Sequence, residues 1–207
     1  MKAVNLLPSL PQHDARRYRR TTITAALVAG LAALSACGAS TPTATQSSAQ
    51  IATNSVNAGL SAQAAGRLPE AATDYKNAIS HDAHNKFAYY DLGLVDQLTN
   101  QAAAAETNYR AAIQVDPNFV AALYNLAILR TTPSPAEAEE LYRHVISLQA
   151  TDAVAHLNLG FLLRAENRIA EGNVELNTAV ELDSSLAGRI PAGTLATPQP
   201  AKPTATH

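Results

Sequence analysis

Apolar and small side chains recur along the middle of the chain at spacings of three and four residues, in blocks separated by short stretches rich in Gly, Asn or Pro. This spacing places the apolar positions on one face of an α-helix. The blocks come in pairs from Ala52 to Leu186, and the pair repeats about every 34 residues, a period typical of stacked helical hairpins. The pattern predicts four hairpins, over residues 52–85, 86–119, 120–152 and 153–186.

Equivalent places of the four units hold the same kind of side chain. We number the places of each unit from its first residue, which is Ala52, Lys86, Val120 or Ala153. Small residues at places 8 and 20 would let the two helices of a hairpin approach closely, and a large residue at place 24 would fill the space between hairpins. Place 8 holds Gly59, Gly93, Ala127 and Gly160, place 20 holds Ala71, Ala105, Ala138 and Gly172, and place 24 holds Tyr75, Tyr109, Tyr142 and Leu176.

These columns resemble those of the tetratricopeptide repeat family, whose helix-turn-helix unit has about 34 residues. The second unit fits best. The first unit departs from the family pattern, because it has Ser55 and Ala58 at places where larger side chains are usual. The fourth unit has Leu176 in place of the aromatic residue. The resemblance implies an all-α fold, a right-handed superhelical solenoid of about four repeats. The matching residues of the second unit are Tyr89, Leu92, Gly93, Ala105, Tyr109, Ala112 and Pro117.

In this family the first helix of each unit lines a concave surface that binds an extended peptide, and the resemblance implies such a groove here. Place 6 resembles the asparagine ladder with which some members hold a peptide backbone, since an amide both donates and accepts. Two alternatives stay open: places 5 and 9 can instead pack between neighbouring helices, and an Asn on a helix can simply be solvated. The predicted groove comprises Asn57, Asp91, Asn125 and Asn158 at place 6, Leu60, Leu94, Ile128 and Phe161 at place 9, Tyr90 and Tyr124 at place 5, where the outer units have Val56 and Leu157, and Arg164.

The basic clamp with which other members of the family hold a C-terminal carboxylate is not matched. Place 5 is apolar or aromatic in every unit, and Arg164 is the only cation among these groove positions. The sequence therefore disfavours recognition of a chaperone tail.

The N-terminal residues predict an export signal over residues 1–36. A basic stretch that includes Arg16, Arg17, Arg19 and Arg20 precedes the short apolar run 23–34, which is too short for a permanent membrane span. The sequence Leu-Ser-Ala-Cys at 34–37 resembles the lipobox of bacterial lipoproteins, in which the cysteine thiol is acylated and becomes the mature N-terminus. Cys37 is the only cysteine, so it is the predicted lipidation site. Whether export follows the general or the twin-arginine route stays open.

Two segments that flank the predicted repeats differ from them in composition. Residues 37–51 are rich in Ser and Thr and predict a flexible tether between the lipid and the first repeat. Residues 187–207 are rich in Pro and Thr and predict a disordered tail. Either Ile190 and Leu195 fold back to cap the last repeat, or that end of the array is open for a partner.

Charge and candidate chemistry narrow the function further. Without residues 1–36 the chain has ten Lys or Arg and sixteen Asp or Glu, a net charge of −6, which argues against a nucleic-acid partner. His81 and His84, with Asp82 between them, could approach a metal on one helical turn, but no third ligand is evident. His144 and His156 stand singly, and no spacing suggests a nucleophile or an acid–base pair. We therefore expect no catalysis, no metal and no cofactor.

The predicted function is that of an adaptor or assembly scaffold that binds a protein or peptide. The lipid anchor would hold it on the extracytoplasmic side of a bacterial cell membrane, on a periplasmic or an outer face. An alternative is an accessory subunit that captures substrate for a membrane-associated enzyme complex of the envelope.

Overall fold

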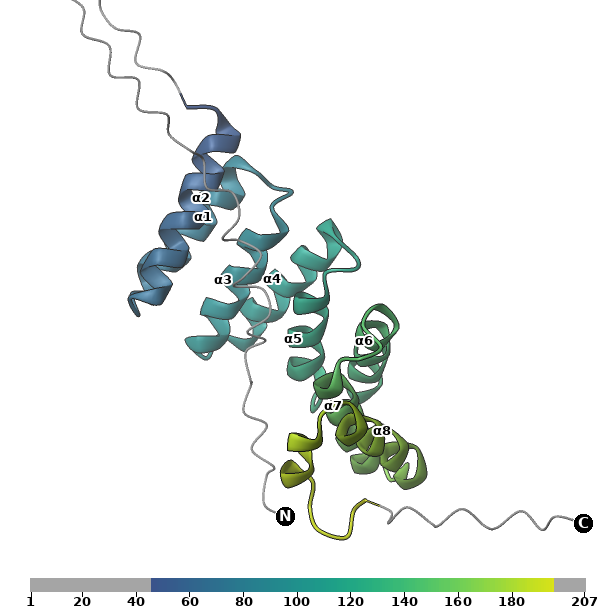
Figure 1. Cartoon of the computed structure of the whole chain (residues 1–207). Coiled ribbons are helices and arrows are strands. Elements are labelled where there is room, and N and C mark those ends of the chain that lie inside the picture. The colour runs from purple at the N-terminus through teal and green to yellow at the C-terminus, as the bar shows by residue number, and fades with distance from the viewer. Residues whose placement is uncertain (1–45, 196–207) are drawn as a thin grey trace, which may run out of the picture. The chain divides into compact units, whose positions relative to one another are not determined.

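The computed structural model describes residues 46–195, and all regular structure in that range is helical. Eight α-helices follow one another and a short 3-10 helix ends the series, as Figure 1 shows in chain order. The predicted all-α fold is confirmed. The helices are α1 Ser48–Ala64, α2 Leu68–His81, α3 Lys86–Leu98, α4 Ala102–Val115, α5 Val120–Arg130, α6 Pro135–Leu148, α7 Ala153–Ala165, α8 Ile169–Leu182 and the 3-10 helix η2 Ser184–Arg189.

Consecutive helices pack against each other along the whole series, from α1 on α2 to η2 on α8. Helices α1 and α2, α3 and α4, α5 and α6, and α7 and α8 form the four hairpins that the period predicts. Helix α1 begins at Ser48, so the tether predicted over residues 37–51 is wrong at its C-terminal end. The apolar Ile51 and the buried Ala52 draw this part of the chain into the first turns of the helix.

The hairpin turns explain the Gly and Asn residues that interrupt the apolar pattern. Gly66, Asn100 and Asn167 have φ values of 73°, 59° and 65°, in the left-handed region that Gly and Asn tolerate best. After each of them the next backbone N–H reaches back to a carbonyl of the preceding helix, as from Arg67 to Ala62 at 2.9 Å. The third hairpin, one residue shorter, closes instead through the Ser134 N–H and the Arg130 carbonyl at 2.9 Å.

The small residue at place 8 leaves space for the large side chain at place 24 of the same hairpin. A Cβ added to Gly93 would lie 2.6 Å from Cε1 of Tyr109, and one added to Gly59 would lie 2.6 Å from Cε1 of Tyr75. In the fourth hairpin Leu176 takes the place of the ring, against Gly160. The glycines therefore let a large side chain lie flat on the facing helix, and each such side chain is almost fully buried.

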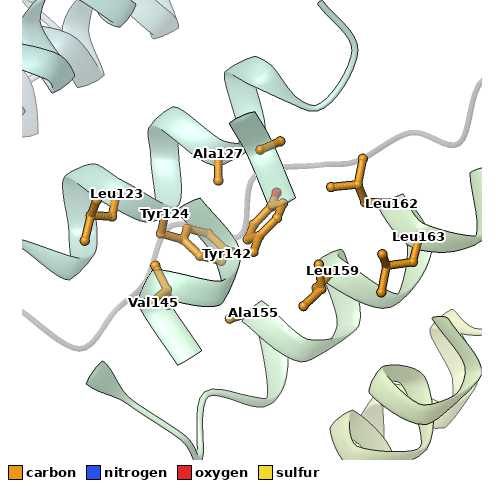
Figure 2. Packing of buried hydrophobic residues seen from close by; sticks show 10 residues of the cluster. Leu123, Tyr124, Ala127, Tyr142, Val145, Ala155, Leu159, Leu162 and Leu163 are labelled. Carbon is orange, nitrogen blue, oxygen red and sulfur yellow. The ribbon is translucent and has the colours of Figure 1, made fainter. Parts of the chain in front are cut away.

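The same side chains also join neighbouring hairpins. Figure 2 shows Tyr142 beside Tyr124 of its own hairpin, with Leu159, Leu162 and Leu163 of helix α7 in the same cluster. The rings of Tyr124 and Tyr142 meet edge to face, with centroids 6.0 Å apart. This cluster thus spans the third hairpin and the first helix of the fourth, as expected of a repeat array in which neighbouring units share contacts.

The C-terminal segment corrects the prediction of a disordered tail from residue 187. Leu186 and Ile190 are buried against Leu157 and Leu176, and Leu195 packs against the same cluster. Their apolar burial against helices α7 and α8 outweighs the Pro and Gly content that suggested disorder. Of the two alternatives for this segment, the structure has the one in which it folds back over the last repeat. Residues 196–207 lie outside the described range.

Candidate functional site

The predicted groove residues lie on the first helix of each hairpin, and we call this set of positions the odd-helix face. It consists of places 5, 6 and 9 of helices α1, α3, α5 and α7, together with Arg164. Its exposure is highest on α1, lowest on α5, and rises again on α7. On α1, Asn57 is exposed and Leu60 is 36% exposed, whereas on α5 both Tyr124 and Asn125 are buried. Half-buried positions are Tyr90, Asp91, Leu94, Ile128, Asn158, Phe161 and Arg164.

Two of the place-6 asparagines bind tyrosines of the preceding repeat. The Asn125 amide donates to the Tyr90 hydroxyl at 3.2 Å, and the Asn158 amide donates to the Tyr124 hydroxyl at 2.7 Å. Asn125 is only 2% exposed. These amides therefore brace one repeat against the next, and Asn125 has little surface left for a peptide.

Asp91 stands at the same place in the second repeat but has no such link. Place 5 is a tyrosine in the second and third repeats, but in the first repeat it is Val56, which has no hydroxyl. Among residues 46–195 no hydrogen bond or ion pair to the Asp91 side chain is found, and burial raises the pKa of this carboxyl to about 7. Asp91 is half-buried, so part of the residue remains accessible to solvent.

An aromatic cluster adjoins this part of the face. Phe87, at place 2 of α3, is 40% exposed and meets Phe119 edge to face at 5.5 Å, and Phe119 in turn meets Tyr90 at 5.3 Å. The Lys86 ammonium lies over both phenylalanine rings and is paired with Asp116 at 2.5 Å. The sequence prediction omitted Phe87, although place 2 is a surface position of a first helix and an exposed aromatic residue there is a detectable signal.

The C-terminal segment covers the other end of the face. Ile190 and Leu195 pack in one cluster with Leu157 and Phe161 of α7. Burial raises the pKa of Tyr124, and the positive charge of Arg189 opposes that rise, so η2 lies near this tyrosine. The chain thus supplies its own cover for the odd-helix face at repeat 4.

Of these histidines, His156 lies in a buried hydrogen-bond network, whereas His81 and His84 lie at the surface. His156 is buried, with Nδ1 2.6 Å from Oε2 of Glu175 and Nε2 3.2 Å from the Ala150 carbonyl. His81 and His84 are both exposed, and the His84 N–H donates to the Asp82 carboxylate at 3.0 Å to open the turn between repeats. Within residues 46–195 no three His, Cys, Asp or Glu side chains come together as a metal site would require.

The predicted signal and the lipidation site Cys37 fall in residues 1–45, outside the described range. In the part of the chain that is described, no helix has the length and apolar character needed to cross a bilayer.

Comparison with known proteins agrees with the repeat architecture. Residues 88–119, which span most of the second hairpin, match the tetratricopeptide repeat family. No curated protein matches the chain. MamA from Desulfovibrio magneticus RS-1 is 20% identical, with a TM-score of 0.61 over 65% of this chain and 76% of that one.

Two further solved structures share the fold. YrrB, described as a TPR protein with an unusual peptide-binding site, is 20% identical, with a TM-score of 0.61 over 66% of this chain and 71% of that one. The first TPR of Spaghetti (RPAP3), bound to the HSP90 peptide SRMEEVD, is 19% identical, with a TM-score of 0.55 over 57% of this chain and 95% of that one. The described part of this chain has the all-α fold of tetratricopeptide repeat proteins.

Proposed function

We propose that the protein is a lipid-anchored extracytoplasmic adaptor that binds an extended segment of a partner protein on the N-terminal half of its odd-helix face. The observation that carries this proposal is the exposure of Leu60 and Phe87 beside the polar groups of Asn57 and Asp91. Apolar anchors with a few polar groups nearby are what a peptide-binding surface needs. Two proteins of the same fold are described with a bound peptide or a peptide-binding site, which supports the proposal.

The binding half of the proposal is tested with the full chain by crosslinking in bacterial envelope extract. The double variant Leu60→Ser with Phe87→Ser should lose at least tenfold of the crosslinked partner, because both changes remove exposed apolar contacts without opening the core. The matched control is Val174→Ser with Leu182→Ser, which removes two exposed apolar side chains from α8. Equal retention of every partner by both double variants would contradict the binding surface.

Deleting the chain after Leu186 would not be a clean test of binding. That deletion removes Ile190 and Leu195, which cover Leu157 and Phe161, so it would disturb the fold of repeat 4 as well as any C-terminal binding site. Point variants on exposed positions avoid this ambiguity.

The anchoring half rests on the resemblance of residues 34–37 to a lipobox. Cys37→Ala should leave a precursor that is neither acylated nor cleaved before residue 37, and it should move from the detergent phase to the aqueous phase. Two acyl chains anchor a protein stably because each buried methylene contributes about 0.8 kcal/mol. If the unchanged protein partitions into water and its N-terminus lies elsewhere, the proposed anchor is wrong.

A further inference from the structure

We propose that the carboxylate of Asp91 binds a cationic side chain, a lysine or an arginine, in the partner segment held on the odd-helix face. The inference rests on the proposed function, because it assumes that this face is where the partner binds. It adds the chemistry of that partner, which is a basic residue flanked by apolar ones.

The link between place 5 of one repeat and place 6 of the next is missing at the first junction. At the second and third junctions between repeats, the place-6 amide is used internally by a tyrosine hydroxyl. At the first junction the tyrosine is replaced by Val56 and the amide by Asp91. The pair that braces the later junctions is therefore absent here, and a half-buried carboxyl group, which accepts hydrogen bonds when it is ionised, stands in its place.

The groups around Asp91 do not neutralise it. The Asp91 carboxyl interacts electrostatically with the phenols of Tyr75 on α2 and Tyr109 on α4, neither of which carries a positive charge. Their hydroxyls donate to Gln63 and Gln97, each at 2.8 Å. Of the cations nearby in sequence, Lys86 is held by Asp116.

A half-buried carboxylate without a counter-ion is costly, and a cation brought by a ligand removes that cost. Residues 46–195 carry sixteen carboxylates and nine Lys or Arg side chains. At least five of those cations are already paired with carboxylates of the chain, namely Lys86, Arg110, Arg130, Arg143 and Arg168. The excess negative charge complements a basic partner segment and would also speed its association.

The neighbours of Asp91 define the rest of the segment. Phe87, one helical turn earlier on the same helix, and Leu60 on α1 offer exposed apolar surface on the same face. Asn57, at the equivalent place of the first repeat, has an exposed amide that can pair with a peptide unit. An extended segment with apolar side chains on both sides of one Lys or Arg fits these positions.

The test uses the full chain and two pools of synthetic peptides with random apolar flanks. One pool has lysine at its centre and the other has norleucine, which keeps the four side-chain carbons and lacks the ammonium group. We expect the lysine pool to bind about tenfold or more tightly, since hydrogen bonds to a charged group are among the stronger ones. Asp91→Asn should abolish that preference, while Glu140→Gln, an exposed change of the same charge on α6, should preserve it.

Each other outcome overturns the inference in a recognisable way. If both pools bind equally to the unchanged chain, the face binds peptides but Asp91 does not select a cation, so the proposed function survives alone. If the preference persists in Asp91→Asn, the cation is bound elsewhere. If neither pool binds, and the envelope crosslinks are also unaffected by Leu60→Ser with Phe87→Ser, both the inference and the proposed function fail.

Discussion

The junction between the first and second repeats differs from the two that follow it in what its polar side chains do. At the later junctions an asparagine of one repeat donates to a tyrosine of the repeat before it. At the first junction the equivalent residues are Asp91 and Val56, which cannot form that bond. Place 6 therefore forms a link between repeats where place 5 of the preceding repeat is a tyrosine. Where that residue is Val56, the place-6 side chain has no such link.

The ion-pair networks between helices also differ between the first hairpin and the later ones. Arg130 on α5 joins Glu106 of α4 at 3.0 Å and Glu137 of α6 at 2.7 Å, and Arg168 joins Glu139 of α6 at 2.5 Å. An isolated exposed pair contributes only about 0 to 1 kcal/mol, but charges shared among several partners hold each other in place. Within the described residues these networks begin at α4, so the first hairpin depends more on its apolar contacts.

The proposed binding surface and the bracing contacts thus lie in different halves of the array. The first two repeats present Leu60 and Phe87 to solvent, while the chain covers the face of the fourth repeat with Ile190 and Leu195. In a repeat protein each unit contacts only its neighbours, so one end can be less stable and open while the other is braced.

The largest effect should come from removing the cover of the fourth repeat. Ile190→Ala should lower the free energy of unfolding by about 2 kcal/mol, because it opens a cavity over Leu157 and Leu176. Hydrogen exchange should show the loss of protection in α7 and α8, with little change in α1 and α2. Ile169→Ala, at an exposed position of α8, is the control. An equal loss of protection in the first hairpin would contradict the division between the two ends.

The next effect tests the hairpin contact itself. Gly93→Ala should cost about 1 to 2 kcal/mol, since its Cβ would lie 2.6 Å from the ring of Tyr109 and overpacking strains both helices. The measurement is a denaturant melt of each variant. Gly188→Ala is a matched control, because nothing lies within 4 Å of a Cβ at that position. If the two variants melt alike, the close approach at place 8 is wrong.

A smaller effect of opposite sign should come from Asp91. The folded protein holds the pKa of this carboxyl at about 7, above its ordinary value of 3.8, so folding favours the protonated form. Stability from this group is therefore present at low pH and lost as pH rises through 7. Asp91→Asn should raise the free energy of unfolding by roughly 1 kcal/mol at pH 8 and by almost nothing at pH 4. Melts of the unchanged chain and of Asp91→Asn at the two pH values check this, and an equal difference between the two proteins at pH 4 and pH 8 would contradict it.

The sequence was sufficient for the hairpins because their signals are local. Gly66, Asn100 and Asn167 mark the turns by the backbone angles they tolerate, and the small residues at place 8 pair with a large one sixteen places later in the same unit. Because both partners of such a contact lie in the same unit and recur in every unit, aligning the four units is enough to predict the contact.

The details of the candidate site were less accessible, because they depend on pairs that lie in different repeats. Nothing in a single unit says that the Asn158 amide reaches the hydroxyl of Tyr124, about one period earlier. The folding back of the C-terminal segment is likewise only one of two alternatives from the sequence, because it depends on contacts with α7 and α8. Three apolar residues, Leu186, Ile190 and Leu195, find their partners on α7 and α8, and the surrounding Pro and Gly obscure them in the sequence.

The smallest effect isolates the brace that distinguishes the later junctions from the first. Asn158→Ala removes a hydrogen bond of 2.7 Å to Tyr124 and should cost about 1 kcal/mol, whereas Asn57→Ala, at the exposed equivalent place of the first repeat, should change stability by less than about 0.5 kcal/mol. Chemical melts of both variants measure the difference. Tyr124→Phe keeps the ring and removes the hydroxyl, so a double-mutant cycle with Asn158→Ala isolates the coupling. A coupling near zero would mean that the link does not brace the repeats, and the contrast between the junctions would then rest on the ion pairs alone.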